Sequence, residues 1–280
     1  EVDRFAPRLS FFFACHSDLF EEAAKFRAAR RLWARLMRER YQASDASCRM
    51  RFHAQTGGVT LTAQQPLNNI VRVAVQTLAA TLGGTQSLHT NGYDEALALP
   101  TAEAATIALR TQQIVACESG VAQTVDPLAG SYYVEALTDE VERRAVELMA
   151  KVEELGGSAR AIEAGFLQEE IGKSAYAYQL AIEAGETVIV GVNKFADGAD
   201  SLEIPAPNYS QLETEQASRV ASVKGSRDAA AVGAALGALE QAARAGQAIL
   251  MPLIIDAVRA RASVGEISDA LERVWGRYRP

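Results

Sequence analysis

The sequence is poor in cysteine and histidine. Its 280 residues include three cysteines, Cys15, Cys48 and Cys117, and three histidines. The cysteines lack CxxC spacing and no two histidines are four residues apart, so we predict neither a zinc site nor a His-based metal site. A sparse, odd number of cysteines also argues against a disulfide framework and favours a reducing compartment. We therefore expect isolated thiols and no metal centre.

Long apolar runs and an excess of basic charge are also missing. The formal net charge is -7, which argues against a nucleic-acid partner. Without a run of 18 apolar residues, no membrane span is expected. The first seven residues contain no Met, no basic segment and no apolar segment, so we expect no signal peptide and suspect a fragment. These features predict a cytoplasmic protein, or a mitochondrial matrix protein if the source is eukaryotic.

Several catalytic signatures are absent as well. We find no phosphate-binding loop of the Walker or dinucleotide type, and no supported Ser-His-Asp spacing. The two Gly-Gly pairs, at 57–58 and 83–84, are better explained as tight turns or helix ends. No lysine lies between Lys25 and Lys151, which excludes a Schiff-base lysine on the second to fourth predicted strands. An unrelated barrel hydrolase or aldolase is therefore disfavoured.

Short apolar stretches alternate with longer helical ones in the first 135 residues. The predicted strands are 8–15, 50–56, a third that follows Gly84, and 121–125; the predicted helices are 19–41, 66–82 and 102–118. Repeated strand–helix units of about 34 to 43 residues predict a parallel α/β fold. The carboxyl ends of such strands lie on one face, which usually carries the functional site.

The first predicted helix has the clearest local signals. Asp18 precedes it and Glu21 follows three residues later, the spacing of a capping box. Arginines near its end match the helix dipole. An apolar i+4 row that begins at Phe20 predicts that one side of this helix faces a sheet.

After residue 135 the pattern becomes mostly helical. We predict helices at 138–155, 159–164, 169–184, 211–224, 229–245, 247–262 and 266–278, an extended stretch at 187–192 and a loop at 196–209. Ser263 and Glu266 again have capping-box spacing. This half lacks polar strand ends, so we interpret 1–135 as the functional domain and 136–280 as a helical layer or linker.

Polar side chains gather on the second and third predicted strands. His53 and Gln55 share one strand face, and Ser87, His89 and Asn91 share another. Amides, hydroxyls and imidazoles recognise carbonyls, amides and sugar hydroxyls without imposing a strong charge. Structural alternatives stay open at this point. His53 could be a hydrogen-bonded core residue, His89 could tie adjacent loops, and Glu95 could be a first-turn helix charge.

Six longer stretches carry a resemblance: "RLSFFF", "RFHAQTGGVTLTAQQPLNN", "GGTQSLHTNGYDEALALPT", "VDPLAGSYYVE", "VIVGVNKF" and "SVGEISDAL". They resemble the large chain of the methylmalonyl-CoA mutase family, whose members are adenosylcobalamin-dependent acyl-CoA mutases. The resemblance implies the second half of a (β/α)8 TIM barrel at 1–135, with the acyl-CoA along the barrel axis. Residues 136–280 would then be a helical linker that leads toward a cobalamin-binding domain or subunit.

The resemblance also implies roles for single residues. Arg8, Ser10, His53, Gln86 and Ser87 resemble acyl-CoA contacts. His53 and Gln55 resemble catalytic residues beside the thioester and the corrin. On the cofactor side, the matching positions are Gln55, Gly58, Asn91 and Glu95. No metal ligand is implied.

Departures from the family pattern indicate which members of the family the sequence resembles most. The sequence has "FFFACHSDLFEE" where "FFWGIG" is expected, and Val59 where a Trp is expected. Both features are more similar to two-subunit relatives that act on isobutyryl-, hydroxyisobutyryl- or ethylmalonyl-CoA, and to some microbial methylmalonyl-CoA mutases. The Asp-x-His-x-x-Gly motif of the cobalamin ligand is absent, and the family's central Tyr, His and Arg match nothing here.

These gaps imply partners. We expect the N-terminal half of the barrel, a cobalamin-binding domain or small subunit, and a homo- or hetero-oligomer; the chain alone should be inactive. A competing hypothesis is a non-catalytic assembly module, a half barrel that docks a partner mutase chain through its open strand edges.

Overall fold

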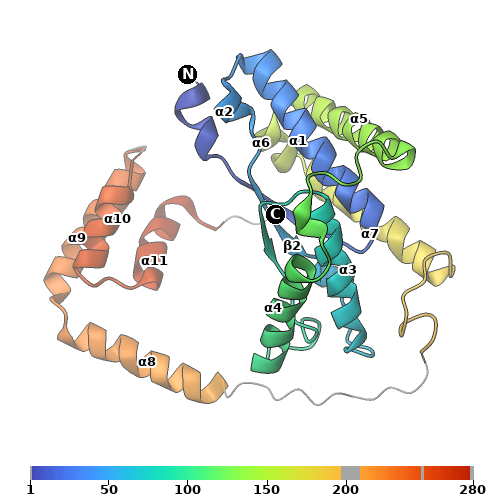
Figure 1. Cartoon of the computed structure of the whole chain (residues 1–280). Coiled ribbons are helices and arrows are strands. Elements are labelled where there is room, and N and C mark those ends of the chain that lie inside the picture. Colours follow the sequence, from blue (N-terminus) through green and yellow to red (C-terminus); the bar gives the residue numbers. More distant parts are fainter. Residues whose placement is uncertain (1, 197–208, 247–248, 278–280) are drawn as a thin grey trace. The chain divides into compact units, whose positions relative to one another are not determined.

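The computed structural model describes residues 2–196, 209–246 and 249–277 (Figure 1). The chain divides into two compact units, Glu1–Ala206 and Pro207–Pro280. These units differ from the functional division that we predict at residue 135, because compactness and function are separate properties. The functional division stays a prediction.

A parallel three-stranded sheet lies at the centre of the first unit. Its strands are β1 (Phe11–Cys15), β2 (Phe52–Thr56) and β3 (Ser87–His89), in the order β1-β2-β3. The register pairs Phe11 with Phe52, and His53 with Ser87. The predicted α/β class with parallel strands is therefore confirmed.

Helices lie between consecutive strands of the first unit and follow the last one. They are α1 (Leu19–Tyr41), α2 (Asp45–Cys48), α3 (Asn68–Leu82), α4 (Ala102–Cys117), α5 (Tyr132–Glu154), α6 (Ser158–Glu163) and α7 (Phe166–Glu183). Helix α1 has the predicted bounds, because Asp18 Oδ1 accepts a hydrogen bond from Glu21 N at 3.1 Å and Gln42 ends the helix in a left-handed conformation. Helix α5 begins at Tyr132, six residues earlier than predicted, after the cap at Ser131.

One face of the sheet packs on α1 and α3. The core contains Phe26 of α1, Phe52 and Ala54 of β2, and Ala79 and Ala80 of α3. The rings of Phe26 and Phe52 are stacked, with centroids 5.2 Å apart. The same face includes Cys15, whose thiol pKa burial raises to about 12. A thiol held protonated in this way is inert at neutral pH.

Helices α1 and α5 lie side by side (Figure 1). A row of arginines on α1 joins them. Arg27 bonds Asp126 and Glu135, at 3.1 and 2.7 Å. Arg31 and Arg35, each one turn further along α1, both pair with the buried Glu142. The spacing of four residues places these arginines on one side of α1, so this side holds α5 while another packs on the sheet.

Two predicted strands differ in the structure. Residues 121–125 were predicted as a fourth strand, but η4 (Val121–Gln123) is a 3-10 turn and Val125 is 93 % exposed. The prediction was wrong: Gly120, at φ 74°, begins a 3-10 turn, and this stretch pairs with no strand of the described sheet. In the stretch 187–192, Val190 forms a single bridge with Lys194. The predicted loop at 196–209 falls, apart from its two end residues, outside the described residues.

The second unit is helical, as predicted. It contains α8 (Tyr209–Ser226), α9 (Ala229–Arg244), α10 (Met251–Arg259) and α11 (Val264–Trp275), with a small core around Leu239, Ala257 and Ile267. The predicted capping box of Ser263 and Glu266 is confirmed. Arg227 and this cap hold the pKa of Glu266 well below its usual range.

Candidate functional site

The second face of the sheet is not covered by the helices that pack on the first. Alternation along the strands directs Phe12, His53, Gln55, Ser87 and His89 to this face. Ser87 and His89 are exposed, and Phe12 is 64 % exposed. We call this set of side chains the open face.

The middle of the open face is built around His53. Its Nδ1 lies 2.6 Å from Ser87 Oγ, a hydrogen-bond distance across the β2–β3 pair. The ring of Phe12 lies beside it, with centroids 5.1 Å apart. His53 is half-buried, so it is neither a core histidine nor freely solvated. The structure thus brings together two of the predicted substrate-binding residues.

The carboxyl ends of β2 and β3 are joined by Asn91. Its Oδ1 accepts a hydrogen bond from Gln55 Nε2 at 2.8 Å, and its Nδ2 donates to the backbone carbonyl of Thr56 at 2.8 Å. Asn91 is only 2 % exposed. The residue therefore orients Gln55, and only its unused hydrogen and lone pair are free for a ligand.

Gly58 lies against both Asn91 and Glu95. A Cβ placed on Gly58 would be 3.0 Å from Asn91 Nδ2 and 3.1 Å from Glu95 Oε1. Even an alanine at position 58 would therefore require these groups to move by a few tenths of an ångström. Glu95 itself is exposed. All four predicted cofactor-binding residues, Gln55, Gly58, Asn91 and Glu95, thus lie at one end of the sheet.

The remaining predicted residues lie at the other end. Arg8 and Ser10 precede β1 and are exposed. Gln86 precedes β3, and its Oε1 accepts a hydrogen bond from the backbone N–H of Phe52, the first residue of β2, at 2.8 Å. The structure therefore separates these three residues from the group at the carboxyl ends. Because β2 has five residues, the two groups are roughly 16 Å apart along the strands.

Sequence reasoning assigned no role to His16, which follows β1. A Cβ on Gly57 would collide with the His16 ring, so this ring lies directly on the Gly57 backbone. The available signal was that His16 follows an apolar strand, as the predicted site residues do. The structure adds His16 to the residues at the carboxyl ends.

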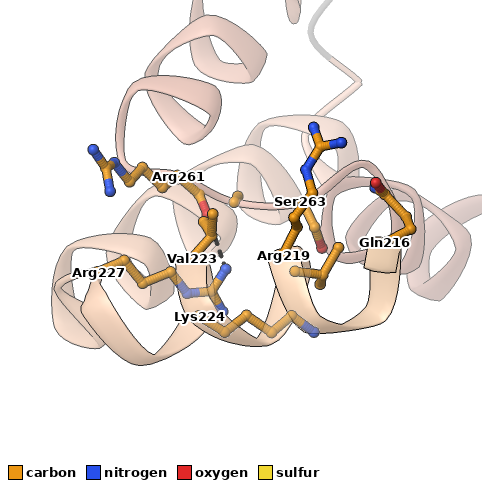
Figure 2. A pocket seen from close by; sticks show the side chains of 9 residues that line it. Gln216, Arg219, Val223, Lys224, Arg227, Arg261 and Ser263 are labelled. Carbon is orange, nitrogen blue, oxygen red and sulfur yellow. Dashed lines mark hydrogen bonds between the residues drawn. The ribbon is translucent and has the colours of Figure 1, made fainter. Parts of the chain in front are cut away.

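A separate hollow of ≈ 360 Å³ lies within the second unit (Figure 2). Arg219, Val223 and Lys224 of α8 line it, together with Arg261 and Ser263. The nearby Arg227 donates to the carbonyl of Arg261 at 2.9 Å and pairs with Glu266. None of the residues that we predicted for the site lines this hollow, and the ion pair of Arg227 and Glu266 ties the end of α8 to α11.

Within the described ranges, no group of three His, Cys, Asp or Glu side chains is placed to hold a metal ion. No helix there is long and apolar enough to cross a bilayer.

Comparison with known proteins decides the family. The family described as methylmalonyl-CoA mutase matches residues 1–277. The chain belongs to the methylmalonyl-CoA mutase family. The large subunit of 2-hydroxyisobutanoyl-CoA mutase from Aquincola tertiaricarbonis is 49 % identical over 280 residues, which cover 99 % of this chain and 50 % of that protein.

Other mutase-family relatives match over the same extent. Methylmalonyl-CoA mutase of Rhizobium meliloti is 47 % identical over 278 residues, and the mitochondrial enzyme of Homo sapiens is 44 % identical over 280. The matches cover 99 % of this chain but only 39 % and 37 % of those proteins. The chain thus spans half or less of the length of these mutase-family relatives.

Proposed function

We propose that the complete protein is an acyl-CoA mutase that rearranges the carbon skeleton of a branched acyl-CoA with adenosylcobalamin. The observation that carries this proposal is a line of hydrogen-bonding groups that crosses the open face and continues at both ends of its strands. It runs from Arg8, Ser10 and Gln86, through His53 and Ser87, to the group around Glu95. Family membership gives this line its meaning, because an extended thioester ligand needs such contacts along its length.

The acyl-CoA would lie along the open face. The exposed Arg8 suits a phosphate or a pantetheine carbonyl at the amino ends of the strands. The pair of His53 and Ser87 would meet the thioester carbonyl, with a hydrogen bond that holds the imidazole in place. Phe12 would cover the acyl group beside His53. The carboxyl ends of the strands would then hold the cofactor.

The residues at the carboxyl ends fit the adenosyl group. Glu95 is exposed and can accept hydrogen bonds from two ribose hydroxyls, while Gly58 leaves the space that Asn91 and Glu95 occupy. When bound, adenosylcobalamin supplies the radical that the rearrangement needs. Asn91 orients Gln55 toward the same region. A protein ligand to the cobalt would come from another domain or subunit, since the sequence lacks Asp-x-His-x-x-Gly.

The chain would form the second half of a TIM barrel, with residues 1–135 as the acyl-CoA-binding part and 136–280 as the linker. Helices α1 and α3 pack on one face of the parallel sheet, as in a (β/α)8 barrel. Within the described residues, β1 and β3 each have an edge without a strand partner. An N-terminal half barrel would supply those partners and would enclose the open face.

The test is turnover by the complete protein together with its cobalamin-binding domain or subunit. Methylmalonyl-, ethylmalonyl-, isobutyryl- and 2-hydroxyisobutyryl-CoA would each be supplied with adenosylcobalamin, and isomer formation would be followed by mass spectrometry. We expect one of the four to be isomerised, and we expect residues 1–280 alone to be inactive. Absence of turnover with all four would overturn the proposal for these substrates.

The open edges also support a second candidate, a non-catalytic module that docks a partner mutase chain. The two proposals differ in the need for ligand contacts. Size-exclusion chromatography of the protein with a catalytic partner, combined with turnover by His53→Ala, separates them. Assembly with unchanged turnover would favour the docking module.

A further inference from the structure

Two fully buried amide side chains lie on one face of α3. Asn69 and Gln76 are seven residues apart, which places them two turns apart on the same side of the helix. Both are 0 % exposed. Amides are rarely buried without strong hydrogen-bonding reasons, so their partners indicate their role.

Asn69 joins the segment after β2 to the segment after β3. Its Nδ2 donates to the carbonyl of Thr62 at 2.9 Å and to that of Tyr93 at 2.8 Å. Its Oδ1 accepts from the N–H of Thr62 at 3.1 Å and from Arg72 at 2.8 Å. All four hydrogen-bonding positions of this amide are used. Tyr93 lies midway between Asn91 and Glu95, so Asn69 fixes the segment that carries both.

Gln76 joins the segment after β1 to the segment after β2. Its Nε2 donates to Ser17 Oγ at 3.0 Å and to Thr60 Oγ1 at 2.6 Å. The Thr60 hydroxyl in turn donates to the carbonyl of Gly57 at 2.6 Å. Among the described residues, Gln76 Oε1 is buried without a partner. A buried oxygen without a partner lowers the stability of the fold. We infer that Gln76 is kept for the two hydrogen bonds that its Nε2 donates.

We propose that Asn69 and Gln76 are positioning residues, which together set the spacing of three segments at the carboxyl ends of the strands: 15–17, 57–62 and 91–95. Through them, α3 places Gly57–Gly58 against Asn91 and Glu95. This inference rests on the proposed function for the role of those segments in adenosylcobalamin binding. The hydrogen-bond geometry that it uses is independent of that function.

The two amides should have different local effects. Loss of the Asn69 amide should release 91–95, where the N–H of Glu95 bonds the carbonyl of Gly92, and should leave 15–17 in place. Loss of the Gln76 amide should release 15–17 and 57–60, where the N–H of Thr60 bonds the carbonyl of Gly57, and should leave 91–95 in place. A general loss of stability would produce no such crossed pattern.

The experiment compares Asn69→Leu and Gln76→Met with the control Thr77→Val in the complete protein with its cobalamin-binding domain or subunit. Thr77 is also in α3 and 1 % exposed, but its hydroxyl bonds the carbonyl of Val73 within the same helix. Amide hydrogen exchange of the ligand-free protein, read by mass spectrometry, should show the crossed pattern for the two variants and neither change for the control.

Ligand binding gives the second measurement. We expect both variants to raise the dissociation constant of adenosylcobalamin about tenfold, and the control to leave it unchanged. If the wild-type protein binds no adenosylcobalamin, the proposed function fails while the exchange pattern still tests the positioning role. If the exchange changes are the same in all three variants, the positioning role is wrong. Should a variant fail to fold, Asn69→Ser and Ser17→Ala, which removes the acceptor of Gln76, repeat the comparison.

Discussion

The two faces of the β1–β3 sheet contrast within the same 13 residues of strand. On the helix-facing side, Phe52 and Ala54 are closed off by α1 and α3, and the Cys15 thiol is held protonated. On the open face, the alternate residues Phe12, His53 and Ser87 retain exposure. His53 is hydrogen-bonded to Ser87 and lies against the ring of Phe12. Because adjacent strand residues point in opposite directions, one stretch of chain contributes to the core on one face and to the proposed ligand contacts on the other. Substitutions on the two faces should therefore fail in different assays.

The largest difference between the two faces should come from replacing one phenylalanine on each face. Phe52→Ala removes a 2 % exposed ring from the core and should lower the free energy of unfolding by about 3–5 kcal/mol. Phe12→Ala, on the open face, should change it by about 0.5 kcal/mol or less but should raise the acyl-CoA KM of the complete protein. Urea denaturation and steady-state kinetics measure the two effects. Equal losses of stability would break the contrast between the faces.

The next largest effect is expected on adenosylcobalamin binding at the carboxyl ends of the strands. Glu95→Gln keeps the size of the side chain and removes its charge, so we expect adenosylcobalamin binding to weaken by about 1.5–3 kcal/mol. The acyl-CoA KM should change much less. Glu103→Gln is a matched control, because Glu103 is also exposed and lies in the first turn of α4. Titration with adenosylcobalamin checks the result, and unchanged binding would remove Glu95 from the site.

A smaller effect, on the acyl-CoA KM, is expected at the amino ends of the strands. Arg8→Ala should raise the acyl-CoA KM about fivefold without changing adenosylcobalamin affinity, because an exposed cation contributes a modest amount to phosphate binding. Arg4→Ala is the control, since Arg4 is likewise exposed at the end of a 3-10 turn before β1. Identical kinetics for the two variants would exclude a specific contact by Arg8.

The mildest test uses pH and leaves the sequence unchanged. The pKa of the Cys15 thiol is raised from 9.0 to about 12 by burial, so the folded state holds this proton more tightly than the unfolded state. The resulting stability is complete below pH 9 and is lost as the pH rises toward 12. At about pH 8, an alkylating reagent should modify the exposed Cys117 rapidly and Cys15 only on unfolding. Rapid labelling of Cys15 in folded protein would contradict the closed character of that face.

The accuracy of the sequence predictions follows from how local their causes are. Helix α1 was predicted to the residue, because its cap at Asp18 and its apolar row lie within the helix itself. The strand at 121–125 was wrong, since a strand depends on a partner that lies elsewhere in the chain. An apolar stretch that includes the 93 % exposed Val125 cannot be distinguished from a true strand by composition.

The candidate site was also predicted only as far as local sequence patterns reach. Alternation predicted that His53 and Gln55 share one face of their strand and that Ser87 and His89 share one face of theirs. The structure places all four on the open face. Alternation did not reveal that the Gln86 side chain accepts a hydrogen bond from the first residue of β2. Nor did it reveal that Asn69 and Gln76 bond the segments at the carboxyl ends of the strands. Those bonds join residues up to 59 positions apart. The available signal was the spacing of Asn69 and Gln76, which are seven residues apart and so lie on one side of α3.

Helix α1 has one consequence for tolerance to substitution. Its Phe26 side is constrained by the sheet, and the row of Arg27, Arg31 and Arg35 is constrained by α5. Few positions of this 23-residue helix are then free to vary, and Glu39, exposed near its end, is one of them. A saturation scan of α1 should therefore find a narrow permissive strip in place of the broad one that a surface helix normally shows.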